Sequence, residues 1–375
     1  MNSSDDSSTS DTCSDGVQNF AKAAIVLRRI KALQSTPPPV VNPIPKLTGA
    51  QWMQLNLQDP ARCKENLRMT PNAFLHLNHC LAEYGLKSTK ECSSMEDLGL
   101  YIWTCAHRSA VRECKDRFAR SLDTISRKTS KVAEIMFRWA QTVLVPADRK
   151  YAQVSSELAE YAPWFDGCIG AIDGTHIPVE VNQEAKVDFI NRKGDVSINV
   201  CAIVDMHGRF TYVGAGKAGA CHDMAVLQDC QGDRKFPHPP PGRYYLADSG
   251  YMEQDGYMTP FRETRYHRSQ FQGIDVRKLD RQEKFNYIHS KLRNIIERRF
   301  GHLKERWHIL QGVPFYKREK QAMIIISCFA MDNYLWLRKY GDGTTYDPSE
   351  WVLMNTMTST STLRELVSAA VWPAR

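Results

Sequence analysis

Three features that would indicate a secreted, disulfide-bonded or membrane protein are missing from this sequence. The eleven cysteines are odd in number and form no C-x-x-C pair, which favours reduced thiols over a disulfide framework or a zinc site. The N-terminal segment MNSSDDSSTSDTCSDG has no apolar core and no basic leader, so we expect no secretory signal. The longest apolar stretch near the C-terminus, Met323 to Leu337, carries Asp332 and Asn333 and is too short to span a bilayer. We therefore expect a soluble intracellular protein without a membrane partner.

A large excess of charge of either sign is also absent. The formal net charge is +7 over 375 residues and the pI is about 8.8, a balance that permits nucleic-acid binding without requiring it. No polybasic nuclear signal stands out. The chain is longer than one average domain, so we expect two domains and a tail.

The first part of the chain, residues 1–49, divides by composition into three pieces. Residues 1–16 contain four acids and no base, which predicts an acidic disordered tail. Val17 to Leu33 mixes apolar and basic residues in the manner of an amphipathic helix, which would dock on a partner or on this protein. Thr36 to Pro45 is rich in proline and predicts an extended linker.

Residues 50–150 predict an all-helical domain. Thr70 before Pro71 has the order of an N-cap followed by the first helical residue. Ser93 and Glu96 have the spacing of a capping box, and Ser121 is placed to cap a third helix. The region therefore contains at least three helices with recognisable starts.

Positive charge gathers at one place in this helical region. Between Arg108 and Lys131 there are eight Lys or Arg and three Asp or Glu, a local charge of +5. Such a charge fits a helix-turn-helix-like element that faces DNA phosphates, although a solvated helical face would have the same composition. The candidates for DNA contact are Arg112, Arg117, Arg120, Arg127 and Lys128.

From about residue 160 the periodicity changes to that of strands. Two short apolar runs, Cys168–Ile172 and Tyr244–Ala247, read as buried strands with an aspartate at the carboxyl end, Asp173 and Asp248. Between them, residues 196–213 predict a hairpin of two strands, and a helix begins shortly afterwards.

This order of elements predicts the fold class. It is the opening of an α/β fold, a ribonuclease H-like mixed-sheet domain, which we place at residues 160–340 after the helical domain and before a tail at 341–375. In such a sheet the first and fourth strands lie side by side. Asp173 and Asp248 would then be neighbours.

A third acid, Glu297, lies in a helical stretch. Arg293, one turn before it, shares its flank with Gly301 and Lys304. A glycine inside a helix costs about 1 kcal/mol relative to alanine, which suggests that something approaches closely at Gly301. Between Lys291 and Arg306 there are six Lys or Arg and two Glu, a basic surround suited to a polyanion. The alternative is that Glu297 is a surface ion-pair partner of Arg293.

Together the three acids form a candidate metal site. Two carboxylates about 4 Å apart repel by roughly 4 kcal/mol at an effective dielectric near 20, so a cluster of three requires a cation or partial protonation. Oxygen ligands favour Mg²⁺, with Mn²⁺ as a substitute. Each Asp-Gly or Asp-Ser-Gly sequence taken alone would also fit an ordinary turn.

Four segments in this order resemble the Harbinger-type (PIF/Harbinger) DDE transposases and their domesticated relatives, most of all the plant members. The segments are Ala171–Pro178 (AIDGTHIP), Val213–Gly216 followed by His222-Asp223, Leu246–Tyr251 (LADSGY), and Phe285–Ser290 through Ile296–Lys304 (IERRFGHLK). The likeness covers about 165 to 340, and the helical region less specifically.

The resemblance implies a function and a site. Asp173, Asp248 and Glu297 would be the catalytic and metal-binding triad of a nuclease that cleaves phosphodiester bonds by a two-metal mechanism. His176 and Asp223 are nearby candidates, with sheet-edge bonding and an N-cap as their alternatives. Phosphate contact is expected from Arg293, Arg298, Arg299 and Lys304, while Asn286 and His289 would touch DNA or pack and cap locally.

Such transposases commonly act with a Myb/SANT-like partner protein that assists DNA binding and nuclear entry. We therefore expect DNA and such a protein as partners, a homo-oligomer as a further option, and location in the nucleus, or in the cytoplasm without the partner. A domesticated chromatin- or transcription-associated binding protein is the main alternative, and a metal hydrolase that does not act on DNA is a third. The sequence does not reveal the target DNA.

Overall fold

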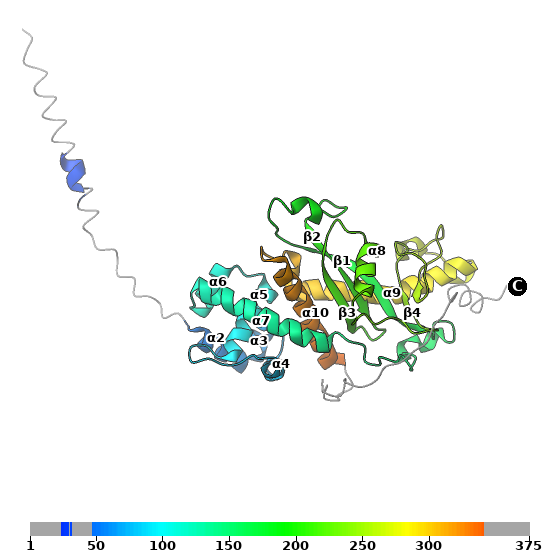
Figure 1. The fold of residues 1–375 in the computed structure, drawn as a ribbon, viewed down its shortest axis with the longest axis horizontal. Coiled ribbons are helices and arrows are strands. Elements are labelled where there is room, and N and C mark those ends of the chain that lie inside the picture. Colours follow the sequence, from blue (N-terminus) through cyan, green and yellow to red (C-terminus); the bar gives the residue numbers. More distant parts are fainter. Residues whose placement is uncertain (1–23, 30, 32–46, 341–375) are drawn as a thin grey trace, which may run out of the picture. The chain divides into compact units, whose positions relative to one another are not determined.

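The computed structural model describes residues 24–29, 31 and 47–340, and residues 47–340 belong to one compact unit (Figure 1). Within the preceding unit, residues 24–29 and 31 are helical, in agreement with the amphipathic helix expected there. The predictions of an acidic tail, a proline-rich linker and a C-terminal tail fall outside the described residues.

The helical region begins the compact unit. Its helices are α2 (Gly49–Gln58), α3 (Pro60–Leu67), α4 (Pro71–Glu83), α5 (Ser94–His107), α6 (Val111–Phe118) and α7 (Leu122–Val143). The three predicted N-caps are confirmed, because Thr70, Ser93 and Ser121 each accept a hydrogen bond from the backbone N–H three residues on. The capping box predicted at Ser93 is wrong in one half, since the Glu96 carboxylate accepts from Arg120 instead.

A five-stranded mixed sheet follows, in the order β3-β2-β1-β4-β5. Strand β2 runs antiparallel to both of its neighbours, β1 and β3, whereas β1, β4 and β5 run parallel to one another. The predicted neighbourhood of the first and fourth strands is confirmed. The strands are β1 (Cys168–Pro178), β2 (Ser197–Val204), β3 (Phe210–Ala218), β4 (Tyr244–Leu246) and β5 (Tyr257–Met258).

Three longer helices pack around this sheet, α8 (Asp223–Gln231), α9 (Arg281–Arg306) and α10 (Arg318–Tyr340). Short 3₁₀ helices lie at Ser156–Tyr161, Lys186–Phe189, Arg268–Phe271, Val276–Lys278 and His308–Gln311. No helix within the described ranges is long and apolar enough to cross a membrane.

Alternate residues of the strands face two different cores. Ala171 and Ala202 belong to the larger core, which contains Ile296 and other apolar residues of α9 and α10. Ile172 and Cys201 belong to a smaller core with residues of α8. Because successive strand residues point to opposite faces, α9 and α8 cover opposite faces of the sheet (Figure 1).

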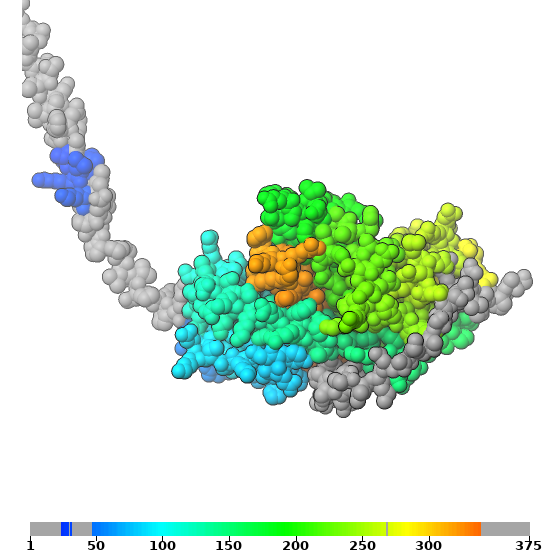
Figure 2. Space-filling model, in the orientation of Figure 1, coloured from blue at the N-terminus to red at the C-terminus, as the bar shows by residue number. Residues whose placement is uncertain are grey.

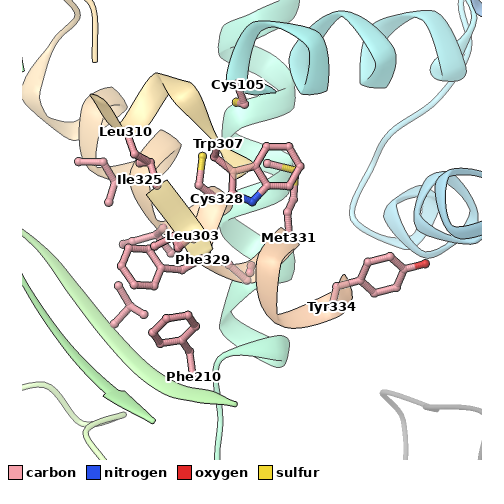
Figure 3. Close-up of a cluster of buried hydrophobic side chains, with 14 of the residues drawn as sticks. Cys105, Phe210, Leu303, Trp307, Leu310, Ile325, Cys328, Phe329, Met331 and Tyr334 are labelled. Atoms are coloured by element: carbon pink, nitrogen blue, oxygen red, sulfur yellow. The ribbon is translucent and has the colours of Figure 1, made fainter. Parts of the chain in front are cut away.

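Helix α10 joins the helical region to the sheet. Asn333 donates to the carbonyls of Val143 in α7 and Phe210 in β3, both at 3.1 Å. Figure 3 shows the apolar contacts around it, where Trp307 and Phe329 lie among side chains from α5, α9, α10 and β3. In the space-filling view the segment after α9, in orange, lies between the cyan helical region and the green sheet region (Figure 2). The two predicted regions therefore share one core.

Candidate active site

The pairing of β1 with β4 sets two of the three acids side by side. The last registered pair of these parallel strands is Ala171 with Leu246. Asp173 and Asp248 each follow two residues later, so they lie at one level and face the same side of the sheet. Asp248 follows the end of its strand as predicted. The prediction that Asp173 ends a strand is wrong, because β1 continues to Pro178 through its antiparallel pairing with β2.

Helix α9 brings the third acid to the same face. The helix starts at a capping box, in which Asp280 accepts from the N–H of Glu283 and the Glu283 side chain accepts from the N–H of Asp280. Leu292 and Ile296 are buried against the sheet, which fixes the rotation of the helix about its axis. Arg293 and Glu297, one turn apart, then point along the edge of the packed face toward the aspartates.

The centre of the cluster is the guanidinium of Arg293. Its Nη1 donates to Asp173 Oδ2 at 2.8 Å, and its Nη2 donates to Glu297 Oε1. The distance from Nη2 to Asp248 Oδ1 is 3.9 Å. The remaining donor, Nε, bonds the hydroxyl of the buried Tyr266 at 2.7 Å. All three predicted acids therefore lie around one buried cation.

The cluster opens from the core toward solvent. The side chains of Arg293 and Asp173 are 9% and 20% exposed, whereas those of Asp248 and Glu297 are 38% and 49% exposed. Burial raises the pKa of the Asp173 carboxyl to about 6, although Arg293 and the N–H of Gly174 act in the opposite direction. Burial acts to lower the pKa of Arg293, but Tyr266 and the surrounding carboxylates raise it above its ordinary value.

The donor set suits a hard divalent cation. Three carboxylates from β1, the end of β4 and α9 face one point, and oxygen is the ligand that Mg²⁺ and Mn²⁺ prefer. Across residues 47–340, however, no three His, Cys, Asp or Glu side chains are already close enough together to hold one metal ion. The acids are gathered around Arg293 rather than around one another. The three carboxylates are therefore of the right type to bind a divalent metal, and Arg293 contacts the same carboxylates.

The two nearby candidates lie on the other face of the sheet. His176 lies three residues after Asp173 in β1, so its side chain points to the opposite face of the sheet. Its Nδ1 is 3.0 Å from Ser197 Oγ. Burial lowers the pKa of the His176 imidazole, although Asp223 acts to raise it. Asp223 accepts from Asn199 at 2.8 Å. The prediction that Asp223 is an N-cap is wrong, because His222 holds that position and Asp223 is the first residue of α8.

Gly174 has a specific role between the two faces. A Cβ atom at this position would lie 2.8 Å from Asp223 Oδ1, closer than real contacts allow. The Asp-Gly sequence is therefore required by a close approach inside a strand, and the turn that would also fit Asp173-Gly174 is wrong. At Gly301, by contrast, a Cβ would meet nothing within 4 Å, so the close approach predicted there does not involve the described protein.

The basic residues of α9 have different roles. Arg299 is 2% exposed and pairs with Asp332, so the prediction that it contacts phosphate is replaced by a structural role. Lys304 donates to Thr175 Oγ1 at 2.8 Å and to the His176 carbonyl at 3.0 Å, and burial lowers the pKa of its amine. Arg298 is exposed and remains a candidate for DNA contact.

Two further candidates before Glu297 hold local structure. The buried Asn286 bonds the backbone of Phe261 and Arg265, and His289 Nε2 lies 2.8 Å from the carbonyl of Met258. Of the two alternatives considered for them, packing is the one observed. These contacts hold the segment that carries Tyr266, a site residue that the sequence analysis missed because it lies in an irregular stretch without periodicity.

The basic residues between Arg108 and Lys131 also divide into those that form ion pairs with buried acids and those that are exposed. Arg120 and Lys128 each form a 2.7 Å ion pair, with the buried Glu96 and Asp97 at the start of α5. Arg120, in the connection between α6 and α7, and Lys128, in α7, thus tie these segments to α5, which corrects their prediction as DNA contacts. The side chains of Arg112, Arg117 and Arg127 are exposed, with Arg117 4.9 Å above the ring of Trp103.

Comparison with known proteins adds independent evidence. Residues 172–333 match the family model of the DDE superfamily endonuclease, and residues 44–138 match a domain family of unknown function. All three acids fall inside the first range. No solved structure matches the chain.

Relatives in several organisms share this part of the chain. "Putative nuclease HARBI1" of Homo sapiens is 25% identical over 225 residues, which cover 58% of this chain and 60% of that protein. The protein of the same name from Xenopus laevis is 22% identical over 223 residues, with the same coverage. "Protein ALP1-like" of Arabidopsis thaliana is 26% identical over 239 residues, 57% of this chain and 55% of that protein. The chain thus spans at most about 60% of the length of these relatives.

The resemblance drawn from four motifs is confirmed at the level of the superfamily, since the matched range contains nearly all of those motifs. Residues 172–333 of this chain are thus similar to the DDE superfamily endonuclease family, and the chain is similar at modest identity to "Putative nuclease HARBI1" and to the plant "Protein ALP1-like".

Proposed function

We propose that this protein is a metal-dependent DNA endonuclease of the Harbinger type, with Asp173, Asp248 and Glu297 as its catalytic triad. The observation that carries the proposal is the gathering of these three carboxylates, from three separate elements, within 3.9 Å of one guanidinium. The family match and the names of the relatives support nuclease chemistry. The proposal that DNA is the substrate rests on the resemblance and on the exposed arginine side chains of the protein.

The three carboxylates would hold Mg²⁺ or Mn²⁺, in the two-metal arrangement that the resemblance implies. When bound, the metal lowers the pKa of an attacking water and stabilises negative charge on the phosphate and the departing oxygen. The chain's own groups orient the site. The N–H of Gly174 donates to Asp173 Oδ1 at 2.9 Å and Arg293 bonds Oδ2, so both oxygens of this carboxylate are fixed in direction. Glu297, the most exposed acid, faces the solvent side from which DNA would approach.

We also propose a ribonuclease H-like fold and a DNA-facing surface for this protein. The strand order β3-β2-β1-β4-β5, with one antiparallel and one parallel neighbour for β1, supports a ribonuclease H-like fold. The exposed Arg112, Arg117, Arg127 and Arg298 are the proposed phosphate contacts. A helix-turn-helix role for α6 and α7 rests on the local charge of +5 between Arg108 and Lys131. A Myb/SANT-like partner, strand transfer, a homo-oligomer and a nuclear location rest on the resemblance.

The test is cleavage of supercoiled DNA in the presence of Mg²⁺ or Mn²⁺. We expect Asp173→Asn and Glu297→Gln to lower the cleavage rate by at least about 100-fold, because each removes a charged ligand. Glu305→Gln is the matched control, since it changes an exposed acid on the same helix outside the cluster, and its activity should equal that of the wild type. Equal activity in all four proteins removes the enzyme proposal.

One observation favours the alternative of a domesticated chromatin- or transcription-associated binding protein. Arg293 already neutralises part of the acid cluster, and no ready metal group exists among the described side chains. This alternative predicts DNA binding that does not change with EDTA and no cleavage with any divalent metal. Cleavage that disappears in Asp173→Asn contradicts it.

A further inference from the structure

Arg293 is held among the acids as an interior group rather than offered to solvent. Its side chain is 9% exposed, and its Nε, Nη1 and Nη2 all have oxygen partners from different parts of the chain. A guanidinium fixed in this way is a poor contact for a DNA phosphate. The prediction that Arg293 binds phosphate therefore gives way to a role toward the acids themselves.

The charges of the cluster explain why a cation is placed there. Three ionised carboxylates and one guanidinium leave a net charge of −2 at the site, and like charges about 4 Å apart repel by roughly 4 kcal/mol at an effective dielectric of 20. Arg293 offsets this repulsion without any metal. The same positive charge opposes the entry of a divalent cation into the same space by an interaction of the same order.

We propose that Arg293 is the resident counter-cation of the site, which holds the three carboxylates together before metal arrives and competes with the metal for them. The inference rests on the proposed function. It makes Arg293 a positioning residue, since it acts through the carboxylates and not on the substrate. The sequence suggested for Arg293 either an ion pair with Glu297 or a contact with phosphate.

The geometry also assigns which acids respond first. Asp248 lies at 3.9 Å from Nη2, beyond hydrogen-bond distance, and both Asp248 and Glu297 are more than a third exposed. Asp173 is the most buried acid and stays bonded to Nη1 and to the N–H of Gly174. Asp248 and Glu297 would therefore be the first acids to exchange Nη2 for a bound metal, while Asp173 would keep its bond to Nη1.

The first test needs no metal. In EDTA, Arg293→Gln should lower the melting temperature, because it leaves a buried carboxylate without its counter-ion. Adding Asp173→Asn to Arg293→Gln should recover part of that loss, since the uncompensated charge is gone. Such recovery is a coupling energy that a double-mutant cycle measures directly. If the decreases in melting temperature caused by the two substitutions are simply additive, Arg293 is a packing residue and the proposal is overturned.

The second test measures Mn²⁺ affinity by isothermal titration calorimetry. We expect Arg293→Gln to bind Mn²⁺ about tenfold more tightly than the wild type, because the competing charge is removed. Arg293→Lys keeps the charge and should bind within about threefold of the wild type. Lys291→Gln, which removes a charge from the same helix at a residue paired with Glu160, should leave the affinity unchanged.

The outcomes separate this proposal from the proposed function. Unchanged or weaker Mn²⁺ binding by a folded Arg293→Gln overturns the competition while the nuclease proposal stands. Tight binding by both Arg293→Gln and Arg293→Lys shows that charge is not the cause and also overturns it. Absence of Mn²⁺ binding by the wild type and every folded variant overturns both proposals. Where Arg293→Gln does not fold in EDTA, Arg293→Lys and the double variant carry the comparison.

Discussion

Helix α9 carries two buried arginines that belong to opposite kinds of cluster. Around Arg293, three carboxylates share one guanidinium, and two of those carboxylates are more than a third exposed. Around Arg299 the ratio is reversed, because the single carboxylate of Asp332 pairs with both Arg299 and Arg306. Asp332 is completely buried there, and the Arg299 guanidinium lies 3.9 Å above the ring of Trp336.

The difference shows how a candidate metal site can be distinguished from a structural ion-pair cluster on the same helix. The cluster around Asp332 has an excess of positive charge, but Asp332 is fully buried and the Arg299 guanidinium is covered by the rings of Phe210 and Trp336. Arg299 Nε and Nη1 are buried there without a hydrogen-bond partner, so this cluster offers no group to a ligand from solvent. The cluster around Arg293 has an excess of negative charge and opens to solvent, so it can take up a further cation. Four predictions test this contrast, in order of decreasing effect.

The largest effect is expected at the closed cluster. Asp332→Asn leaves the guanidinium of Arg299 buried without a charged partner, which costs about 3–5 kcal/mol in comparable cases. The free energy of unfolding, measured by urea denaturation, should fall by that amount while Mn²⁺ affinity of the folded protein stays at the wild-type value. A decrease in the free energy of unfolding of less than about 1 kcal/mol would contradict the structural role given to Asp332.

Metal should stabilise the protein through the open cluster alone. A free Mn²⁺ concentration about 100 times the Kd raises the free energy of unfolding by about 2.7 kcal/mol, because only the folded state binds. We expect this gain, seen as a higher Tm, in the wild type and in Asp332→Asn. It should be largely absent in Asp173→Asn, and EDTA should reverse it. An equal gain in Asp173→Asn would place the metal elsewhere.

The pH dependence of stability should reveal Asp173. Its folded-state pKa is raised to about 6 from an ordinary value of 3.8, so the folded state binds the proton more tightly and stability falls as pH rises between these values. The contribution is about 2 kcal/mol in EDTA, from 1.4 kcal/mol per pKa unit with a reduction for partial exposure. The stability of the wild type relative to Asp173→Asn should therefore fall from pH 4 to pH 6 and level off above. A flat or rising difference contradicts the raised pKa.

The smallest effect is expected at the exposed base between the two clusters. Arg298→Gln should weaken DNA binding by less than about 1 kcal/mol and lower the slope of log affinity against log salt by about 1, because one phosphate contact is lost. Fluorescence anisotropy over a range of salt concentrations measures both quantities. If the slope is unchanged, Arg298 does not contact phosphate.

Much of the frame was predictable because it depends on local chemistry. The N-caps at Thr70, Ser93 and Ser121 follow from side chains that bond their own backbone within three residues. The order of strands and helix between Asp173 and Asp248 follows from apolar runs and turns, and the resemblance placed these acids in a DDE endonuclease domain. These inferences need no knowledge of distant contacts.

The failures have a common cause, which is that charge does not reveal burial. Arg120, Lys128 and Arg299 read as phosphate contacts because they are basic and helical, yet each one meets a buried acid from another element. Asp332 was noticed only as an interruption in an apolar run. The end of β1 was misplaced because Asp173 and Gly174 are typical of turns, whereas β2 extends the strand through them.

The sequence by itself determined which acids this protein has, on which kind of element each stands, and which family their order resembles. The tertiary structure alone decided that the acids meet around Arg293, that Tyr266 supports this arginine, and that His176 and Asp223 face the other way. The physical reason is the range of the interactions. Caps, turns and periodicity act within a few residues, whereas an ion pair between residues 173 and 293 exists only after the sheet and α9 have packed.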